Sequence, residues 1–333
     1  IFFNEFNRYK KKSESGQVFT PDHITSLMYK ILEVNANDKI LDAACGSGAF
    51  LVKSMSNMIK EVGGINTKEA KKIKEHSLFG IEFDREIFAL ACANMMIHKD
   101  GKTNLEQLDS RDKEASEWIK SKGITKVLMN PPFERKYGCK KIVENVLNSV
   151  PSGIKCAFIM PEKKMEKDKM GKLLEKHHLE AIIKLPEKLF DAGVTTSIYV
   201  FETGKKQVGE TYGCYIEDDG LERVKNQGRQ DIKDKWMELE NYWVDSIRKR
   251  NDTKYGTSQW IDPKKFLSYQ KPKAEFVLYE EDFVKTMMNY LMFKNKIDVK
   301  EFSDKLINKT LYNSEILKED NNIVIKIKDA EDE

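Results

Sequence analysis

Four consecutive residues, Asn130-Pro131-Pro132-Phe133, follow an apolar run and are of the types needed to hold a flat group that carries an amine. The two prolines have fixed φ angles and no amide hydrogen, so the loop is stiff and its carbonyls can accept hydrogen bonds. The Asn130 side chain adds another carbonyl, and two such oxygens can bind both hydrogens of one NH₂ group. We expect Phe133 to be exposed and to stack on a planar base. A proline brake at the end of a strand would explain the prolines, but not Asn130 and Phe133.

A second candidate site is the glycine turn Asp42-Ala-Ala-Cys-Gly-Ser-Gly48, between a strand-like and a helix-like segment. Gly46 and Gly48 allow a tight turn and a close approach of the backbone to a ligand. A glycine pair alone is weak evidence, because many turns contain one. Asp42 would repel a phosphate and suits a ligand with a positive amino group and a sulfonium. Cys45 has no histidine nearby in sequence, so we interpret it as a small turn residue rather than a nucleophile.

Two further acids end the next strand-like segments. Glu82 stands where a carboxylate can accept both hydroxyls of a ribose, as an acid does in dinucleotide-binding folds. The alternative role for Glu82, a charge at the start of the next helix, is better filled by Asp84, which we predict to be the N-cap. We expect Phe83 to lie against an adenine face and Asp109 to accept a hydrogen bond from an exocyclic amine.

A fourth stretch, Ser15-Gly-Gln-Val-Phe-Thr-Pro21, is a polar turn with one aromatic residue. It has two interpretations. In the first, it is a simple helix lead-in, with Thr20 as the cap and Pro21 at the first helical position. Alternatively, it is a lid that folds over a cofactor.

These residues lie between alternating strand-like and helix-like segments, which predicts an α/β, Rossmann-like, doubly wound sheet with helices on both faces. Ligands of such sheets bind at the carboxyl ends of the strands. The last two predicted strands have no room for a helix between them, so we expect them to pair antiparallel at the end of a mostly parallel sheet. The predicted strands cover residues 39–42, 78–82, 105–108, 126–129, 157–160, 181–185, 197–201 and 213–216.

After about Gly220 the sequence becomes polar and rich in lysine, and the stretches 281–293 and 300–307 have helical apolar spacing. We therefore predict a catalytic domain over residues 1–225 and a mainly helical C-terminal extension over residues 226–333. The extension is a candidate for docking a partner.

The bulk composition narrows the class of protein. The 57 basic and 54 acidic residues nearly balance, which allows nucleic-acid binding only through a local basic patch or a partner. Five cysteines without a C-x-x-C pair favour free thiols in a reducing cytoplasm, and we predict neither a disulfide framework nor a metal site. No apolar run approaches the ~18 residues of a membrane span. The sequence starts at Ile1 without a methionine, which leaves room for a segment upstream.

The motif order S-G-Q-V-F-T-P, D-A-A-C-G-S-G-A-F, G-I-E-F-D and N-P-P-F resembles the amino-group DNA methyltransferases that make N6-methyladenine, in their gamma order. The later stretches 158–161, 183–186 and 193–201 are similar to the modification subunits of type I restriction-modification systems. The resemblance runs from about Ser15 to Gly220. Ala43 replaces the family's usual proline, and the family's long helical N-terminal domain does not precede the first motif here.

The resemblance implies the class I methyltransferase fold, S-adenosylmethionine as cofactor, and an adenine flipped out of duplex DNA as target. It also implies a specificity subunit, a second copy of the modification subunit and a restriction subunit as partners. In the family the residues matching Gln17, Phe19, Thr20 and Pro21 close over the methionine end of the cofactor. Those matching Asp42, Ala44, Cys45, Gly46, Ser47 and Gly48 line the cofactor, Glu82 binds its ribose, and Asp109 reaches its adenine. Asn130, Pro131, Pro132 and Phe133 would hold the target adenine.

The resulting hypothesis is in-line methyl transfer to N6 of adenine without a covalent enzyme intermediate. Asn130 and the Pro131 carbonyl would align and polarise the amine. The sequence has no Pro-Cys pair, which argues against C5-cytosine methylation by a cysteine nucleophile. Three alternatives stay open: N4-cytosine methylation, methylation of a protein glutamine, and a non-catalytic scaffold that binds S-adenosylmethionine.

Overall fold

The computed structural model describes residues 20–98, 104–133, 138–167, 171–187, 189–190, 194–224, 228–272, 279–312, 314–319 and 322–327. The chain forms two compact units, residues 1–270 and 271–333. Gln17 and Phe19, which we predicted to close over a cofactor, lie outside the described residues.

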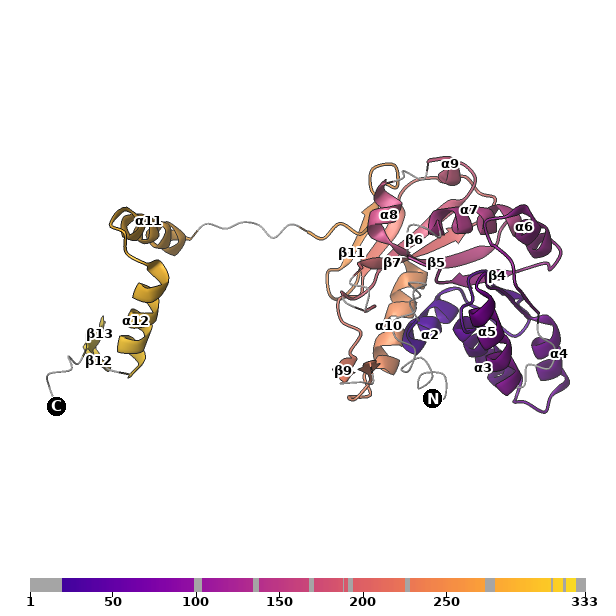
Figure 1. The fold of residues 1–333 in the computed structure, drawn as a ribbon, viewed down its shortest axis with the longest axis horizontal. Helices are drawn as coiled ribbons and strands as arrows, with labels where there is room; N and C mark the ends of the chain where they lie inside the picture. Colours follow the sequence, from indigo (N-terminus) through magenta and orange to yellow (C-terminus); the bar gives the residue numbers. More distant parts are fainter. Residues whose placement is uncertain are drawn as a thin grey trace. The chain divides into compact units, whose positions relative to one another are not determined.

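Within the described residues, the first unit is built on a nine-stranded sheet in the order β11-β8-β6-β7-β5-β4-β1-β2-β3. Figure 1 labels β11, β6, β7, β5 and β4 of this sheet. Neighbours among β1 to β5 run parallel, β7 runs antiparallel to both β5 and β6, and β11 is an antiparallel edge strand. The strands are β1 (Ile40–Asp42), β2 (Leu78–Ile81), β3 (Leu105–Glu106), β4 (Lys126–Met129), β5 (Lys155–Pro161), β6 (His178–Lys184), β7 (Thr196–Glu202), β8 (Thr211–Tyr215) and β11 (Ser258–Ile261).

The predicted doubly wound, mostly parallel sheet is confirmed, but one predicted pair of strands is wrong. We expected 197–201 and 213–216 to pair antiparallel with each other. Instead β7 lies between β5 and β6, whereas β8 pairs parallel with the other side of β6. The connection 203–210 spans two strand spacings, about 10 Å, without needing a helix. A short connection therefore did not require adjacent strands.

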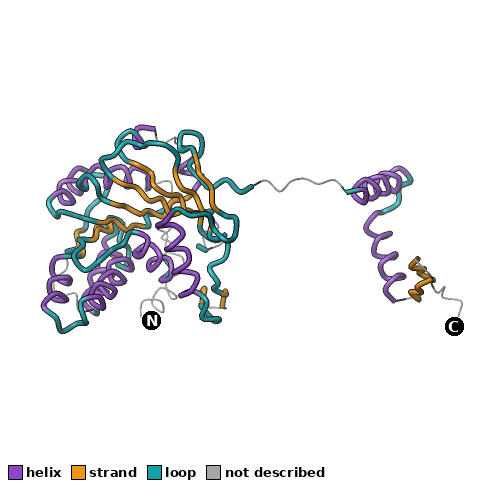
Figure 2. Tube along the Cα trace, turned by 180° about the vertical axis from the view of Figure 1, so that it is seen from behind, coloured by secondary structure: helices purple, strands orange, loops and turns teal. Residues whose placement is uncertain are grey.

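Helices cover both faces of the sheet (Figures 1 and 2). On β4, Leu128 packs into the core with α2, α3 and α10, whereas Val127 packs into the core with α6 and α7. This follows from the two-residue period of a strand, and it explains why a strand buried on both faces is a continuous apolar run. The helices of the first unit are α2 (Asp22–Ile31), α3 (Ala49–Glu61), α4 (Lys68–His76), α5 (Arg85–Ile97), α6 (Lys113–Lys120), α7 (Cys139–Ser149), α8 (Glu162–Lys167), α9 (Gly171–Leu174) and α10 (Trp236–Lys249).

The first unit ends at residue 270, later than the boundary at residue 225 that we predicted. The reason is that α10 and β11 complete this unit. Trp243 of α10 is 2% exposed in the core, and Glu240 of the same helix accepts from the Lys30 ammonium of α2 at 2.6 Å. β11 pairs with β8. A hairpin of β9 (Glu222–Val224) and β10 (Gly228–Gln230) precedes α10.

The second unit contains α11 (Glu280–Lys294) and α12 (Val299–Tyr312), which agree with the two predicted helices. A hairpin of β12 (Ser314–Glu319) and β13 (Asn322–Ile327), which we did not predict, follows them. Across the described part of the chain, no helix is long and apolar enough to cross a membrane.

The N-cap of α5 gives a test of the local structure. Asp84 Oδ1 accepts from the backbone N–H groups of Glu86 at 2.9 Å and Ile87 at 3.1 Å, as predicted for a cap. Asp84→Ala should lower the free energy of unfolding by about 1 kcal/mol because it leaves these donors without that acceptor. Urea denaturation followed by circular dichroism measures the change. Asp84→Ser is the control and should retain most of the stability; equal losses in both variants would contradict the capping role.

Candidate active site

The residues that we predicted to bind ligands lie together at the carboxyl edge of the parallel strands. Asp42 ends β1, Glu82 follows β2, Asp109 follows β3, and Asn130 follows β4. These four strands are neighbours in the order β4-β1-β2-β3 and run parallel, so their ends meet at one edge. Ligand sites of doubly wound sheets lie at this edge.

The glycine turn after β1 is shaped by its own backbone. Gly46 and Gly48 have φ angles of +54° and +85°, which glycine adopts without steric cost. The Cys45 N–H donates to the Ile81 carbonyl at 3.0 Å, and the Gly48 N–H donates to the Cys45 carbonyl at 2.7 Å. A Cβ added at Gly46 would meet no described heavy atom within 4 Å, so the turn borders open space. A ligand can therefore approach this backbone closely.

The Glu82 carboxylate ties this turn to the end of β2. One oxygen accepts from the Gly46 N–H at 3.0 Å and the other accepts from the Asp84 N–H at 2.9 Å. The side chain is 8% exposed, and burial raises its pKa, although the two N–H donors act in the opposite direction. Each oxygen of a carboxylate has more than one acceptor position, so Glu82 retains capacity for ligand hydroxyls.

Asp42 is the most perturbed acid of the site. It is 1% exposed, and its pKa is raised to about 8, mainly by burial and further by the charge of Glu82. The Ala44 N–H, which donates to Asp42 Oδ1 at 3.1 Å, lowers the pKa in part. None of these causes is a positive charge. A cationic ligand beside Asp42 would therefore favour its ionised form.

Burial also raises the pKa of the Cys45 thiol well above its usual range, and the negative charges of Asp42 and Glu82 add to the effect. A thiol in this state is a poor nucleophile. The structure thus agrees with the interpretation of Cys45 as a turn residue.

Two residues that the sequence analysis missed hold the turn in place. The Asn94 side-chain amide of α5 donates to the Ser47 carbonyl at 2.8 Å. The Ser110 hydroxyl, which is 5% exposed, donates to the Ala43 carbonyl. A signal for Asn94 was present, because it is a polar residue at helical spacing from the buried Ile87 and Ala91.

The next pair of predicted residues differs in part from our expectation. Arg111 Nε donates to both oxygens of Asp109, at 2.7 and 3.0 Å, and these bonds lower the pKa of that carboxyl. The carboxylate that we expected to accept from an adenine amine is thus engaged by an arginine that we did not single out. Phe83 is 56% exposed, and the Arg111 guanidinium lies 6.0 Å from the centre of its ring. The exposed ring is compatible with stacking.

The loop after β4 contacts the start of α2. Asn130 Nδ2 donates to the Thr20 hydroxyl at 2.9 Å, which joins two motifs that are 110 residues apart. Pro21, rather than Thr20, is the N-cap of α2, and its carbonyl accepts from the Ile24 and Thr25 N–H groups. Thr20 and Pro21 do lead into α2, but the predicted cap is wrong: Pro21 takes the N-cap position, and the hydroxyl of Thr20 contacts Asn130.

Phe133 lies in a different environment from the one we predicted. Its ring is 7% exposed and packs edge-on against Phe190, with ring centres 5.5 Å apart. We had expected an exposed ring for base stacking. The buried position arises from a core contact with a residue far along the chain, which local sequence does not reveal. Pro131 is buried and Pro132 is half-buried.

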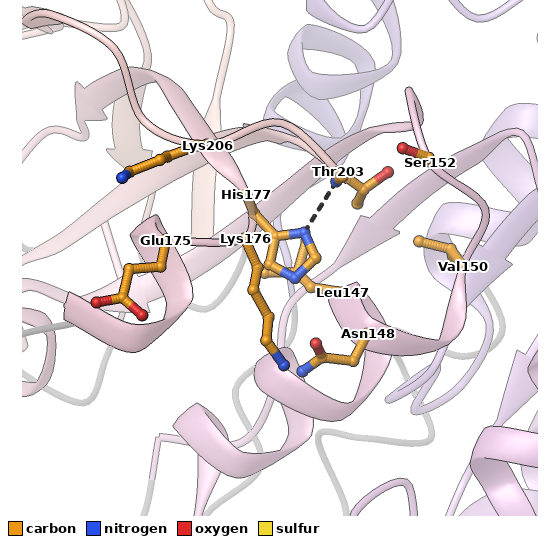
Figure 3. A pocket seen from close by; sticks show the side chains of 10 residues that line it. Leu147, Asn148, Val150, Ser152, Glu175, Lys176, His177, Thr203 and Lys206 are labelled. Atoms are coloured by element: carbon orange, nitrogen blue, oxygen red, sulfur yellow. Dashed lines mark hydrogen bonds between the residues drawn. The ribbon is translucent and has the colours of Figure 1, made fainter.

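A cavity of about 500 Å³ lies away from these residues, between the end of α7, the start of β6 and the end of β7 (Figure 3). His177 lies within it, and its Nδ1 accepts from the Gly204 N–H at 3.3 Å. The cavity borders the amino end of β6, so it belongs to the opposite edge of the sheet. Within the described ranges, no group of three or more His, Cys, Asp and Glu side chains could hold a metal ion.

The raised pKa of Asp42 gives a pH-dependent prediction. The folded protein binds the Asp42 proton more tightly than the unfolded chain, so the stability from this group is present at low pH and is lost as pH rises through about 8. In Asp42→Asn this contribution is absent. The free energy of unfolding of the wild type minus that of the variant should fall by roughly 1 kcal/mol per pH unit between about pH 5 and 8. Urea denaturation at several pH values measures it, and a constant difference would contradict the assignment.

Comparisons with known proteins identify the family. The family model of the N-6 DNA methylases matches residues 1–153 and 150–255. The type II restriction enzyme and methyltransferase RM.BcgI of Heyndrickxia coagulans is 30% identical over 321 residues, which cover 88% of this chain and 49% of that protein. The type I restriction enzyme EcoEI methylase subunit of Escherichia coli is 22% identical over 215 residues, which cover 57% of this chain and 43% of that protein.

Among solved structures, the type I restriction-modification methyltransferase subunit from Streptococcus thermophilus matches with a TM-score of 0.56 and 16% identity, over 76% of this chain and 57% of that chain. The chain spans about half the length of the curated relatives that it matches. A putative class I S-adenosylmethionine-dependent methyltransferase from Listeria monocytogenes matches with a TM-score of 0.53 and 17% identity, over 75% of this chain and 76% of that chain. The sheet order and these two structures show the class I S-adenosylmethionine-dependent methyltransferase fold. With the family model matched over most of its length, the chain belongs to the N-6 DNA methylase family.

Proposed function

We propose that this chain transfers a methyl group from S-adenosylmethionine to N6 of an adenine in DNA, as the modification subunit of a restriction-modification system. The observation that carries the proposal is the arrangement at the carboxyl edge of the sheet. There the two acids Asp42 and Glu82 flank an open glycine turn, and Asn130 follows the neighbouring strand. Membership of the N-6 DNA methylase family supports the same activity.

The residues present fit S-adenosylmethionine. The pKa of Asp42, raised to about 8, indicates a buried carboxyl without a positive counter-charge, and the cofactor carries an ammonium and a sulfonium. Glu82 is held by two backbone N–H groups at the end of β2, where an acid binds ribose hydroxyls in related nucleotide folds. The two acids together disfavour a pyrophosphate. The open space beside Gly46 leaves room for a ligand against the turn.

The loop after β4 fits an exocyclic amine. Because the Asn130 amide is planar, the bond from its Nδ2 to Thr20 fixes the direction of Oδ1 as well. We infer that Asn130 Oδ1 and the Pro131 carbonyl accept the two hydrogens of the target amine. Only a base out of the duplex can present both hydrogens, because one is otherwise paired, so the adenine must be flipped.

In the proposed mechanism the bound cofactor supplies an electrophilic methyl group on a positively charged sulfur. Asn130 and the Pro131 carbonyl turn the lone pair of the amine toward that methyl group. The amine nitrogen becomes positive as it forms the new bond, so both oxygens stabilise the transition state more than the ground state. The two oxygens stay hydrogen-bonded to the hydrogens of the amine until one of these leaves as a proton and passes to water. Removing one preorganised group of this kind typically costs about 10² in rate or more.

The partners follow from the same assignment. We propose duplex DNA as substrate, with a separate specificity subunit that reads the target sequence, a second copy of this chain and a restriction subunit. The nearly balanced charge of this chain supports such partners. DNA is strongly negative, so a chain with little net positive charge binds it better when other subunits supply positive charge.

Asn130→Ala tests the assignment. It should lower the rate of methyl transfer to DNA by about 10² or more, because the amine loses one of two aligning oxygens, while the affinity for S-adenosylmethionine changes little. Wild type and variants are supplied with labelled cofactor, duplex DNA and any co-expressed partner, and digested DNA is analysed for N6-methyladenine by mass spectrometry. Calorimetry gives the cofactor affinity.

Asn148→Ala is the matched control, since Asn148 lines the cavity at the opposite edge of the sheet. It should leave both quantities unchanged. Label found only in N4-methylcytosine or in protein glutamine would contradict the adenine assignment. Binding of cofactor without any transfer would favour the scaffold instead, and full activity of Asn130→Ala would refute the catalytic role.

A further inference from the structure

A buried polar cluster lies at the carboxyl edge, beside the site but outside the glycine turn, the acids after β1 to β3 and the loop after β4. Glu162, the first residue of α8, is 9% exposed and directly follows β5. One of its oxygens accepts from the Ser197 hydroxyl at 2.6 Å, and the other accepts from the Lys184 ammonium at 3.2 Å. Lys184 ends β6 and Ser197 lies at the start of β7. The cluster therefore joins the start of α8 to β6 and β7.

The partners of this cluster are themselves fixed. Ser197 is fully buried and Lys184 is 6% exposed. The Lys184 ammonium also lies 5.5 Å from the centre of the Tyr215 ring, at the end of β8. In addition, the Glu162 N–H donates to the Thr195 carbonyl at 3.1 Å. A buried ion pair that is hydrogen-bonded in this way resists displacement, because breaking it leaves an uncompensated charge.

Lys164 lies two residues after Glu162 on α8 and contacts the Asn-Pro-Pro-Phe loop that follows β4. Its ammonium donates to the backbone carbonyl of Phe133, the last residue of the Asn-Pro-Pro-Phe motif. The ammonium also lies near the thiol of Cys139, the first residue of α7. Burial raises the pKa of that thiol, and the ammonium lowers it in part. Lys164 thus contacts both the end of the motif and the start of the next helix.

The motif needs such an external contact. Pro131 and Pro132 have no amide hydrogens, so they cannot donate the backbone hydrogen bonds that would fix the loop to a neighbouring strand. Their carbonyls must stay directed toward a ligand to act as acceptors. A charged donor on the Phe133 carbonyl, mounted on a helix that is fastened to the sheet, restrains the loop without occupying the acceptors of Asn130 and Pro131.

We propose that Lys164 is a positioning residue that holds the Asn-Pro-Pro-Phe loop in the geometry that binds the target amine, with the Glu162, Lys184 and Ser197 cluster as its anchor. The role in catalysis rests on the proposed function. The role in holding the loop does not, because it follows from the contacts themselves.

Lys164→Met keeps most of the aliphatic stem and removes the ammonium. Hydrogen–deuterium exchange of the full chain, read by mass spectrometry, should show about tenfold faster exchange in peptides covering 127–133 and 139–143, because one charge-assisted hydrogen bond is lost. Peptides covering 40–58, around the glycine turn, should not change. Lys163→Met is the matched control on the same helix, since Lys163 is exposed, and should leave both regions unchanged. Lys164→Arg should restore most of the protection.

In the methylation assay, Lys164→Met should lower kcat about tenfold and leave the Kd for S-adenosylmethionine unchanged, and Lys164→Arg should recover part of the rate. Unchanged exchange in 127–133 would overturn the proposal. Faster exchange across the whole sheet, including global unfolding, would also overturn it, because Lys164 would then stabilise the fold and not the loop. A wild-type chain that transfers no methyl group to DNA would refute the proposed function, and the exchange experiment would still decide the role of Lys164.

Discussion

The Glu82 carboxylate, with the backbone N–H of Gly46 on one oxygen and that of Asp84 on the other, is the interaction on which the site depends most. It joins the turn after β1 to the start of α5, so two adjacent strand ends act as one surface. The turn itself has positive φ angles at Gly46 and Gly48 and lies beyond the residues of β1 that pair with β2 and β4. The Glu82 carboxylate therefore adds to the restraint that Asn94 and Ser110 give the turn.

Burial gives the acids of this edge their chemical character. The pKa values of Asp42 and Glu82 are both raised, and the largest cause for each is burial away from water. Asp109, which is paired with Arg111, has a lowered pKa instead. The edge thus contains two acids whose ionised forms a cation would stabilise. Next to them, the negative charge of Asp109 is already balanced by Arg111. This contrast separates a position that favours a cation, at Asp42 and Glu82, from a position at Asp109 where the negative charge already has a partner.

Local sequence was sufficient for those parts of the fold that local rules determine. The strands from β1 to β5, the cap at Asp84 and the gathering of Asp42, Glu82 and Asn130 follow from apolar runs, capping chemistry and the geometry of parallel sheets. The pairing of β7 and β8 was not determined, because the connection between them is compatible with adjacent strands and also with strands two places apart.

The remaining differences have the same physical origin. Phe133 is buried by Phe190, and α10 is joined to the first unit by Trp243 and by the ion pair with Lys30. These are contacts between residues distant in sequence, and the polar outer face of α10 dominates its composition. Arg111, by contrast, was within reach of the sequence analysis because it is an opposite charge two residues from Asp109.

The hydrogen bond between Asn130 and Thr20 has a thermodynamic consequence. One hydroxyl orients the amide of the loop after β4, and it belongs to the stretch that the sequence predicted to be either a helix lead-in or a lid over a cofactor. A ligand that draws this hydroxyl away must change the free energy of orienting Asn130, and a ligand that binds Asn130 must change the free energy of moving Thr20. The two binding events are then linked, and each alters the affinity of the other by the same factor.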